Sequence, residues 1–89
     1  MKAILLNVSE LPPPEPMIEI LSALASLPQH YYLKVFHSRV PYPLFERLTA
    51  NNWAYQYQEQ QNLGITLYIY HKEDQSLFEK LNTNGISKD

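Results

Sequence analysis

Apolar and polar residues recur along the chain with two different periods, and each change of period marks a boundary between elements. The run AILLNV at residues 3–8 is short, branched and apolar, which is typical of a β-strand. From Met17 the apolar residues recur at helical spacing, until Pro28 ends the helix. Residues 30–37 then alternate with the period of a strand. The first part of the chain therefore predicts a strand, a helix and a second strand.

The second part of the chain predicts one more helix and a β-hairpin. The helix is expected from about Tyr42 to Ala50, with three apolar side chains directed inward, Leu44, Phe45 and Leu48. Residues 53–60 and 65–71 alternate as strands and are joined by a turn at residues 61–64. The order β-α-β-α-β-β favours an α+β fold, a two-layer sandwich in which two helices pack on one face of a mixed four-stranded sheet.

Length and composition suit one small globular domain. The chain has 89 residues, of which 45% are hydrophobic and 18% are charged. Residues 1–74 are expected to form the domain. Residues 75–89 are expected to be a C-terminal tail, in which SLFEKL can make a short helix and the last residues, NTNGISKD, are disordered.

Charge and the lack of cysteine narrow the functions that we expect. The net charge is −2 and the basic residues are scattered, which disfavours binding to nucleic acid or to an anionic membrane. Without cysteine, disulfides, thiolate nucleophiles, persulfide carriers and cysteine-ligated zinc are excluded. No apolar run is long enough for a signal peptide or a membrane span, so we expect a cytoplasmic protein without membrane partners.

Three segments carry a resemblance to a known superfamily. They are LPPPEPM at residues 11–17, HSRVPYPL at residues 37–44 and NNWAYQY at residues 51–57. In this order they resemble the TusA/SirA-like superfamily and, more closely, its small bacterial branch that lacks cysteine and has no known function. The resemblance extends from about Ala3 to His71, and it implies a βαβαββ two-layer sandwich, the same fold that the periodicity predicts.

The first proline-rich segment corresponds to the reactive loop of the sulfur carriers in that superfamily. Their Cys-Pro-x-Pro motif holds a reactive thiolate at a helix N-terminus. Here Pro14, Glu15 and Pro16 match the Pro-x-Pro part, and Pro13 stands at the cysteine position. Since proline has no nucleophile, the resemblance does not carry a sulfur-relay function to this chain.

The two proline-rich corners form one candidate site if the first two strands are parallel. Both corners then lie at the same edge of the sheet, where open α/β sheets usually bind ligands. Arg39, beside the helix N-termini, can hold an anion, and His37 can be a hydrogen-bonding partner, a proton shuttle or a metal ligand. In the similar family, acidic residues are frequent where Ser38 and Val40 stand here, which weakens a metal or acid–base role. The candidate ligand or partner site comprises Pro13, Pro14, Glu15, Pro16, His37, Ser38, Arg39, Pro41 and Pro43. Alternatively, the corners only set the entry angles of the helices, and the second loop is a plain surface loop with a capping serine.

A second candidate surface is the sheet face turned away from the two helices. Alternation places four aromatic residues there, Tyr32, Phe36, Tyr68 and Tyr70. An exposed aromatic patch of this kind suits a protein partner or a weak homodimer. The alternative is that tyrosine simply has good strand propensity. A platform for single-stranded RNA is disfavoured, because Lys34 is the only basic residue of the patch.

No catalytic or metal-binding pattern stands out. His30 and His71 fall on different sheet faces by alternation, which makes them a poor metal pair. The chain shows no recognisable nucleophile–histidine–acid spacing, phosphate loop or paired catalytic carboxylates. We therefore expect no enzyme activity, no metal and no cofactor. The first hypothesis is a non-enzymatic protein-interaction or regulatory module. The second is an accessory protein of sulfur or redox metabolism that binds a small ligand or metal at His37–Arg39.

Overall fold

The computed structural model describes residues 1–61 and 63–83, which form one sheet with helices on both faces. The elements, in chain order, are β1 (Lys2–Asn7), α1 (Glu15–Ala25), β2 (Tyr31–His37), α2 (Tyr42–Ala50), β3 (Trp53–Gln60), β4 (Gly64–His71), the 3₁₀-helix η1 (Lys72–Asp74) and α3 (Gln75–Thr83). The strand order across the sheet is β1-β2-β4-β3. The predicted α+β sandwich with a mixed four-stranded sheet is confirmed.

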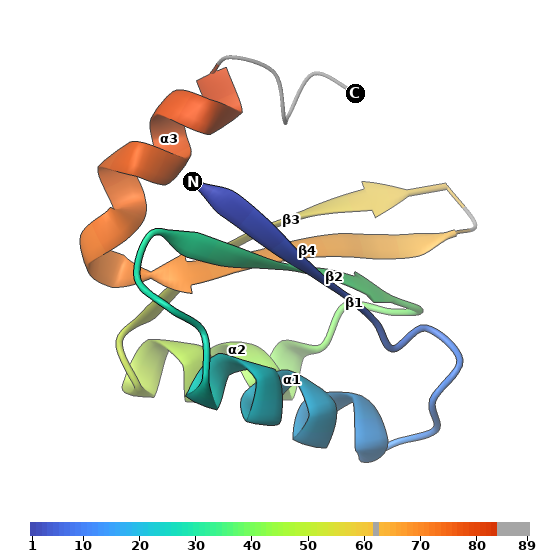
Figure 1. Cartoon of the computed structure of the whole chain (residues 1–89). Coiled ribbons are helices and arrows are strands. Elements are labelled where there is room, and N and C mark those ends of the chain that lie inside the picture. Colours follow the sequence, from blue (N-terminus) through green and yellow to red (C-terminus); the bar gives the residue numbers. More distant parts are fainter. Residues whose placement is uncertain (62, 84–89) are drawn as a thin grey trace.

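The direction of each strand follows from its connection. The link from β1 to β2 passes through α1, and these two strands are parallel, as the sequence predicts. β4 runs antiparallel to both β2 and β3. α1 and α2 lie together beneath one face of the sheet, and α3 lies over the opposite face (Figure 1). Because β1 and β2 are parallel, both strands end at the same edge, where the two proline-rich corners begin.

The main core fills the space between the sheet and the pair α1 and α2. It contains inward residues of β2 and β4, the apolar faces of both helices, and one residue just after β1 and one after α1. The members are Val8, Ile20, Leu24, Leu27, Leu33, Val35, Leu44, Phe45, Leu48, Ile65, Leu67 and Ile69. Most of these positions are those that the alternation and the helical spacing place inside. The tight packing of this layer holds the starts of α1 and α2 against the end of β2.

The opposite face of the sheet is not the exposed aromatic patch that the sequence predicts. Tyr32, Tyr68 and Tyr70 are buried, and Phe36 is half-buried. The cause is Phe78 of α3, which is fully buried and stacks on Tyr70 with ring centroids 4.2 Å apart. Burial accordingly raises the pKa of Tyr32 and of Tyr70 above the usual value of a phenol. The prediction that this face is exposed is therefore wrong.

The helix that covers this face comes from the segment predicted as a tail. The short helix expected there is α3. Asp74, just before this helix, is hydrogen-bonded to His30, just before β2. The Asp74 carboxylate accepts the backbone N–H of His30 at 2.7 Å and contacts the His30 imidazole at 3.0 Å. α3 is thus part of the packed fold, and it extends through the first two residues of NTNGISKD. The disorder expected for the remaining residues, 84–89, lies outside the described residues.

Within residues 1–61 and 63–83, none of the helices has the length and apolar character needed to span a membrane.

Candidate functional site

The two proline corners meet at one edge of the sheet. α1 begins at Glu15 directly after Pro14, and α2 begins at Tyr42 directly after Pro41. Each helix carries another proline in its first turn, where the missing N–H costs no intrahelical hydrogen bond. Neither N-terminus is capped by a side chain. The positive ends of two helix dipoles therefore lie side by side at this edge.

Between the corners lies an open pocket of about 260 Å³. Its walls come from the two proline-rich segments, the first turns of both helices and the end of β2. The lining residues are Pro13, Pro14, Pro16, Met17, Ile20, His37, Arg39, Val40, Pro41, Pro43 and Leu44. We call this hollow the corner pocket. It is apolar apart from His37 and Arg39, and none of its described lining residues carries a carboxylate.

His37 is the last residue of β2 and is only 7% exposed. Its Nδ1 atom accepts the backbone N–H of Arg39 at 3.3 Å, so the neutral imidazole carries its proton on Nε2. Among the described residues, none provides a hydrogen-bond partner for Nε2. Every fully buried side-chain nitrogen or oxygen in the same part of the chain does have a partner, so Nε2 is not fully buried. The Nε2 atom therefore keeps some contact with solvent, and His37 is one of the residues that line the corner pocket.

The surroundings of His37 keep its ring neutral. Burial lowers the pKa of His37 below the usual 6.5, and the positive charge of Arg39 lowers it further. At neutral pH the ring is therefore a hydrogen-bond donor at Nε2 without a charge of its own. Arg39 is exposed and supplies the positive charge beside it. The site can thus offer one donor and one cation to a group bound among apolar side chains.

Most of the residues predicted for this site come together in it. The prolines Pro13, Pro14, Pro16, Pro41 and Pro43 line the corner pocket with His37 and Arg39. Glu15 and Ser38 are exposed and do not line it. Ser38 borders a separate shallow hollow together with Glu59 and Gln60.

Sequence reasoning did not assign four apolar residues to the site, Met17, Ile20, Val40 and Leu44. Met17, Ile20 and Leu44 stood out only as apolar residues of the predicted helices, which does not tell a pocket wall from packed core.

Gly64 was also missed as a residue that shapes the corner. It has φ +86°, and a Cβ there would collide with the carbonyl oxygen of His37 and crowd the Cα of Ser38. Only glycine lets β4 begin this close to the end of β2. The sequence shows a glycine between two predicted strands, which indicates a turn. It does not indicate that this turn contacts the end of β2.

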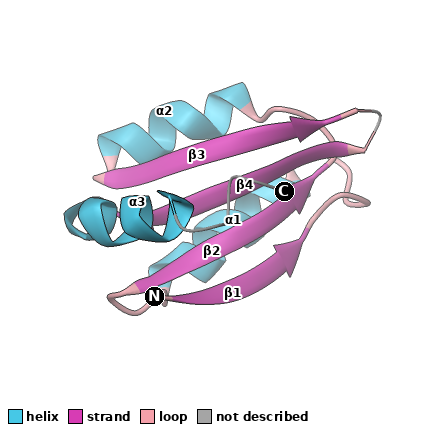
Figure 2. Cartoon of the chain, turned by 90° about the horizontal axis from the view of Figure 1, so that it is seen from above, coloured by secondary structure: helices cyan, strands magenta, loops and turns pink. Residues whose placement is uncertain are grey.

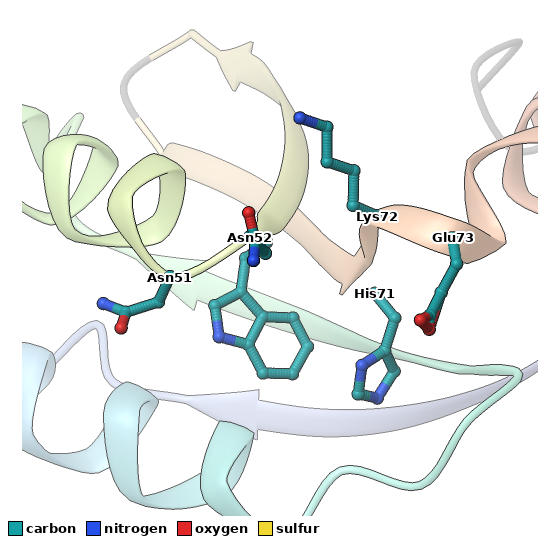
Figure 3. A pocket seen from close by; sticks show the side chains of 6 residues that line it. Asn51, Asn52, His71, Lys72 and Glu73 are labelled. Atoms are coloured by element: carbon teal, nitrogen blue, oxygen red, sulfur yellow. The ribbon is translucent and has the colours of Figure 1, made fainter.

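A second hollow, of about 450 Å³, lies at the opposite end of the sheet and is lined by Asn51, Asn52, Trp53, His71, Lys72 and Glu73 (Figure 3). Here His71 donates its Nε2–H to the carbonyl oxygen of Leu27 at 2.9 Å, and its ring lies 4.6 Å from that of Trp53. The Asn51 amide donates to the carbonyl oxygen of Arg47 at 2.8 Å. Lys72 extends away from His71 in Figure 3. The partners of His71 and Asn51 lie within the protein, so their roles here are structural.

The described residues contain no group of three or more histidine, cysteine, aspartate or glutamate side chains that could hold a metal ion. His30 contacts Asp74, whereas His71 contacts Leu27 and Trp53. The structure gives these two histidines separate partners and does not bring them together.

Comparison with known proteins supplies a family and no activity. Residues 5–71 match the family described as "Uncharacterized conserved protein (DUF2249)", and this range includes every residue of the corner pocket. Neither the curated proteins nor the solved structures contain a match to the chain.

Proposed function

The chain belongs to the DUF2249 family, and we propose that it is a non-enzymatic binding module whose corner pocket holds a small apolar ligand with an anionic group. The observation that carries this proposal is His37. His37 is only 7% exposed and lines a hollow that is apolar apart from itself and Arg39, and no described residue accepts a hydrogen bond from its Nε2–H group. A ligand with an acceptor atom in the hollow would give this donor a partner within the protein.

The charge around the pocket selects an anionic acceptor. Arg39 is positive, the first turns of α1 and α2 present the positive ends of their dipoles, and no described lining residue opposes them with a carboxylate. A carboxylate can accept from His37 Nε2–H and pair with Arg39 at the same time. The remaining walls are proline, methionine, valine, leucine and isoleucine side chains, which favour an apolar body. A volume of about 260 Å³ is at the low end for ligand sites, so the ligand is small.

The proposal also includes a place in the TusA/SirA-like superfamily and a cytoplasmic location. The βαβαββ order and the proline corner before α1 support the first point. Pro13, at the position of the sulfur carriers' cysteine, is part of the pocket wall here. A residue that carries a covalent group in those proteins would thus be replaced by one that only packs against a ligand.

The protein-interaction hypothesis relied on an exposed aromatic face. Since α3 covers Tyr32, Tyr68 and Tyr70, this surface supports no proposal.

The test is an amide-resolved NMR titration with three probes that separate charge from shape: benzoate, its neutral analogue benzamide, and acetate. Benzoate should shift the amide signals of Met17, His37, Arg39 and Leu44 in a saturable way. Benzamide should bind more weakly because it lacks the charge, and acetate because it lacks the apolar ring. Saturable benzoate shifts confined to residues outside the corner pocket would contradict the proposal.

Two arginine variants provide the matched control. Arg39→Gln should weaken benzoate binding about threefold to tenfold, the loss expected for one partly exposed charge-assisted contact. Arg47→Gln removes the same charge from the last turn of α2, away from the pocket, and should leave benzoate binding unchanged. Equal losses in both variants would mean that only the net charge matters and would exclude a defined site at Arg39.

A further inference from the structure

β1 is an edge strand with apolar side chains that the rest of the fold leaves uncovered. It forms one margin of the sheet, with β3 at the other (Figure 2). Ile4, on the face toward α1 and α2, is 39% exposed, and Leu5, on the opposite face, is 65% exposed. β1 thus presents apolar surface on both sides of its free edge.

The other edge of the sheet is protected. β3 carries polar side chains at four of its last five positions, Gln56, Gln58, Glu59 and Gln60. Natural sheets commonly place polar and charged residues on edges to prevent pairing with another chain. β1 has no proline and no bulge in its pairing with β2, and its only charged residue, Lys2, stands at its first position. The two edges therefore differ in whether they can accept a further strand.

The backbone groups that β1 offers at its free edge follow from its pairing with β2. The N–H groups of Lys2 and Val8 donate to His30 and Phe36, so even-numbered residues of β1 face β2. Backbone groups alternate in direction along a strand. The N–H and C=O groups of Ala3, Leu5 and Asn7 therefore point to the open edge.

These three residues are spaced symmetrically about Leu5, and we propose that β1 is a dimerisation edge that pairs antiparallel with β1 of a second copy. Leu5 then exchanges both backbone hydrogen bonds with Leu5 of the second copy, and Ala3 does so with Asn7. Ile4 lies opposite Leu6 on the face toward the helices, and the two Leu5 side chains lie together on the other face. A register centred on Ile4 would leave Asn7 unpaired, so the register centred on Leu5 uses the edge best.

The second copy is a better occupant than an unrelated strand because the edge is self-complementary in both backbone and side chains. A two-fold axis places Leu5 against Leu5 and Ile4 against Leu6, so that both copies use the same surface, as an isologous interface requires. The pairing would join two sheets into one and cover part of Ile4 and Leu5. An edge of six residues is small beside the roughly 1,200–2,000 Å² buried in stable complexes, so the dimer is weak and depends on concentration.

The first test is sedimentation velocity over a concentration series, with two matched variants. Leu5→Glu puts two like charges together at the two-fold axis, while within one copy the new carboxylate lies beside Lys34, the partner of Leu5 in the register. It should raise the dimer dissociation constant about tenfold or more. Ile18→Glu introduces the same charge at a similarly exposed apolar residue, 57% exposed on α1, and should leave the constant unchanged. A chain that stays monomeric throughout, or equal effects of both variants, would overturn the proposal.

The second test uses the wild-type chain alone, so it does not depend on how a variant folds. Amide hydrogen exchange should slow with rising protein concentration at Ala3, Leu5 and Asn7. At Ile4 and Leu6, whose N–H groups already bond to β2, it should not change. A dimer in which the Leu5 amide still exchanges freely would place the interface elsewhere and refute pairing through β1. Protection of the same three amides only after adding another protein would show that a foreign strand is the occupant, and it too would refute the homodimer.

Discussion

His37 and His71 occupy equivalent places at the two ends of the sheet, and the structure uses them differently. Each is the last residue of its strand, β2 or β4, and each faces the layer of α1 and α2. His71 donates Nε2–H to Leu27 and packs on Trp53, whereas His37 lines the open corner pocket and has no described acceptor for the same group. The difference lies in what surrounds each end. The carbonyl oxygen of Leu27 accepts from His71 beside the Trp53 indole, whereas the proline side chains that line the pocket together with His37 offer no acceptor. The same type of residue thus stabilises the fold at one end of the sheet and is a candidate ligand contact at the other.

The largest expected effect comes from altering the backbone that supports the His37 end. Gly64→Ala forces a Cβ into the carbonyl of His37 at a left-handed backbone position, and it should lower the free energy of unfolding by about 2–4 kcal/mol. Asn52, at the His71 end, also has a left-handed backbone, with φ 66°. Asn52→Gly should therefore leave stability nearly unchanged. Chemical denaturation measures both variants, and a Gly64→Ala protein as stable as the wild type would show that the approach of β4 to His37 is not tight.

The next effect separates the roles of the two histidines. His71→Ala removes the donor to the Leu27 carbonyl and the ring beside Trp53, and it should cost about 1–3 kcal/mol of stability. Benzoate binding to the folded variant should be unchanged, because the corner pocket lies at the other end of the sheet. The measurement is denaturation together with the benzoate titration. Weaker benzoate binding in folded His71→Ala would show that the two ends are coupled and that the contrast between them is incomplete.

The smallest effect is the pH dependence that His37 contributes. Its pKa is lower in the folded protein than the usual 6.5, so below about pH 6.5 the unfolded chain binds more protons at this residue than the folded one. The contribution of His37 to the free energy of unfolding should therefore be fully present above that pH. It should decrease as the pH falls toward the folded-state pKa, by at most about 1.4 kcal/mol per pH unit. Denaturation of wild type and His37→Gln between pH 7 and pH 5 tests this, and the variant should show the shallower slope. Identical slopes would mean that His37 is not buried as a neutral ring.

Much of the fold could be predicted, because its signals are local. The strand expected at residues 30–37 is Tyr31–His37, and the alternation that defines it also places His37 on the face toward the helices. The proline corners follow the ends of β1 and β2, and the parallel pairing inferred from two successive βα units brings them together. The location of the candidate site could therefore be predicted from the connectivity and from the residue types at the strand ends.

The failures concern contacts between residues far apart in the chain. The prediction that the tyrosine face is exposed was wrong because Phe78, in α3, packs on Tyr32 and Tyr70. The role of His71 depends on Leu27, a residue 44 positions away. The apolar run at residues 3–8 predicted a strand without indicating that it forms an edge, where Ile4 and Leu5 are exposed. Periodicity indicates on which side of an element a residue lies, but it does not indicate which other residues cover that side.

By itself, the sequence determined the order and type of the elements up to β4, the parallel start of the sheet, the two proline corners and the absence of thiol chemistry. These features depend on periodicity within one element, on the restricted backbone of proline and on the connection between neighbouring elements. The tertiary structure alone decided that α3 covers the tyrosines, that β1 stays open, that Gly64 must lack a side chain, and that His71 bonds to Leu27 whereas His37 lines the corner pocket. Each of these depends on which distant atoms fill the space beside a residue, and a close-packed interior settles that only when all its layers are in place.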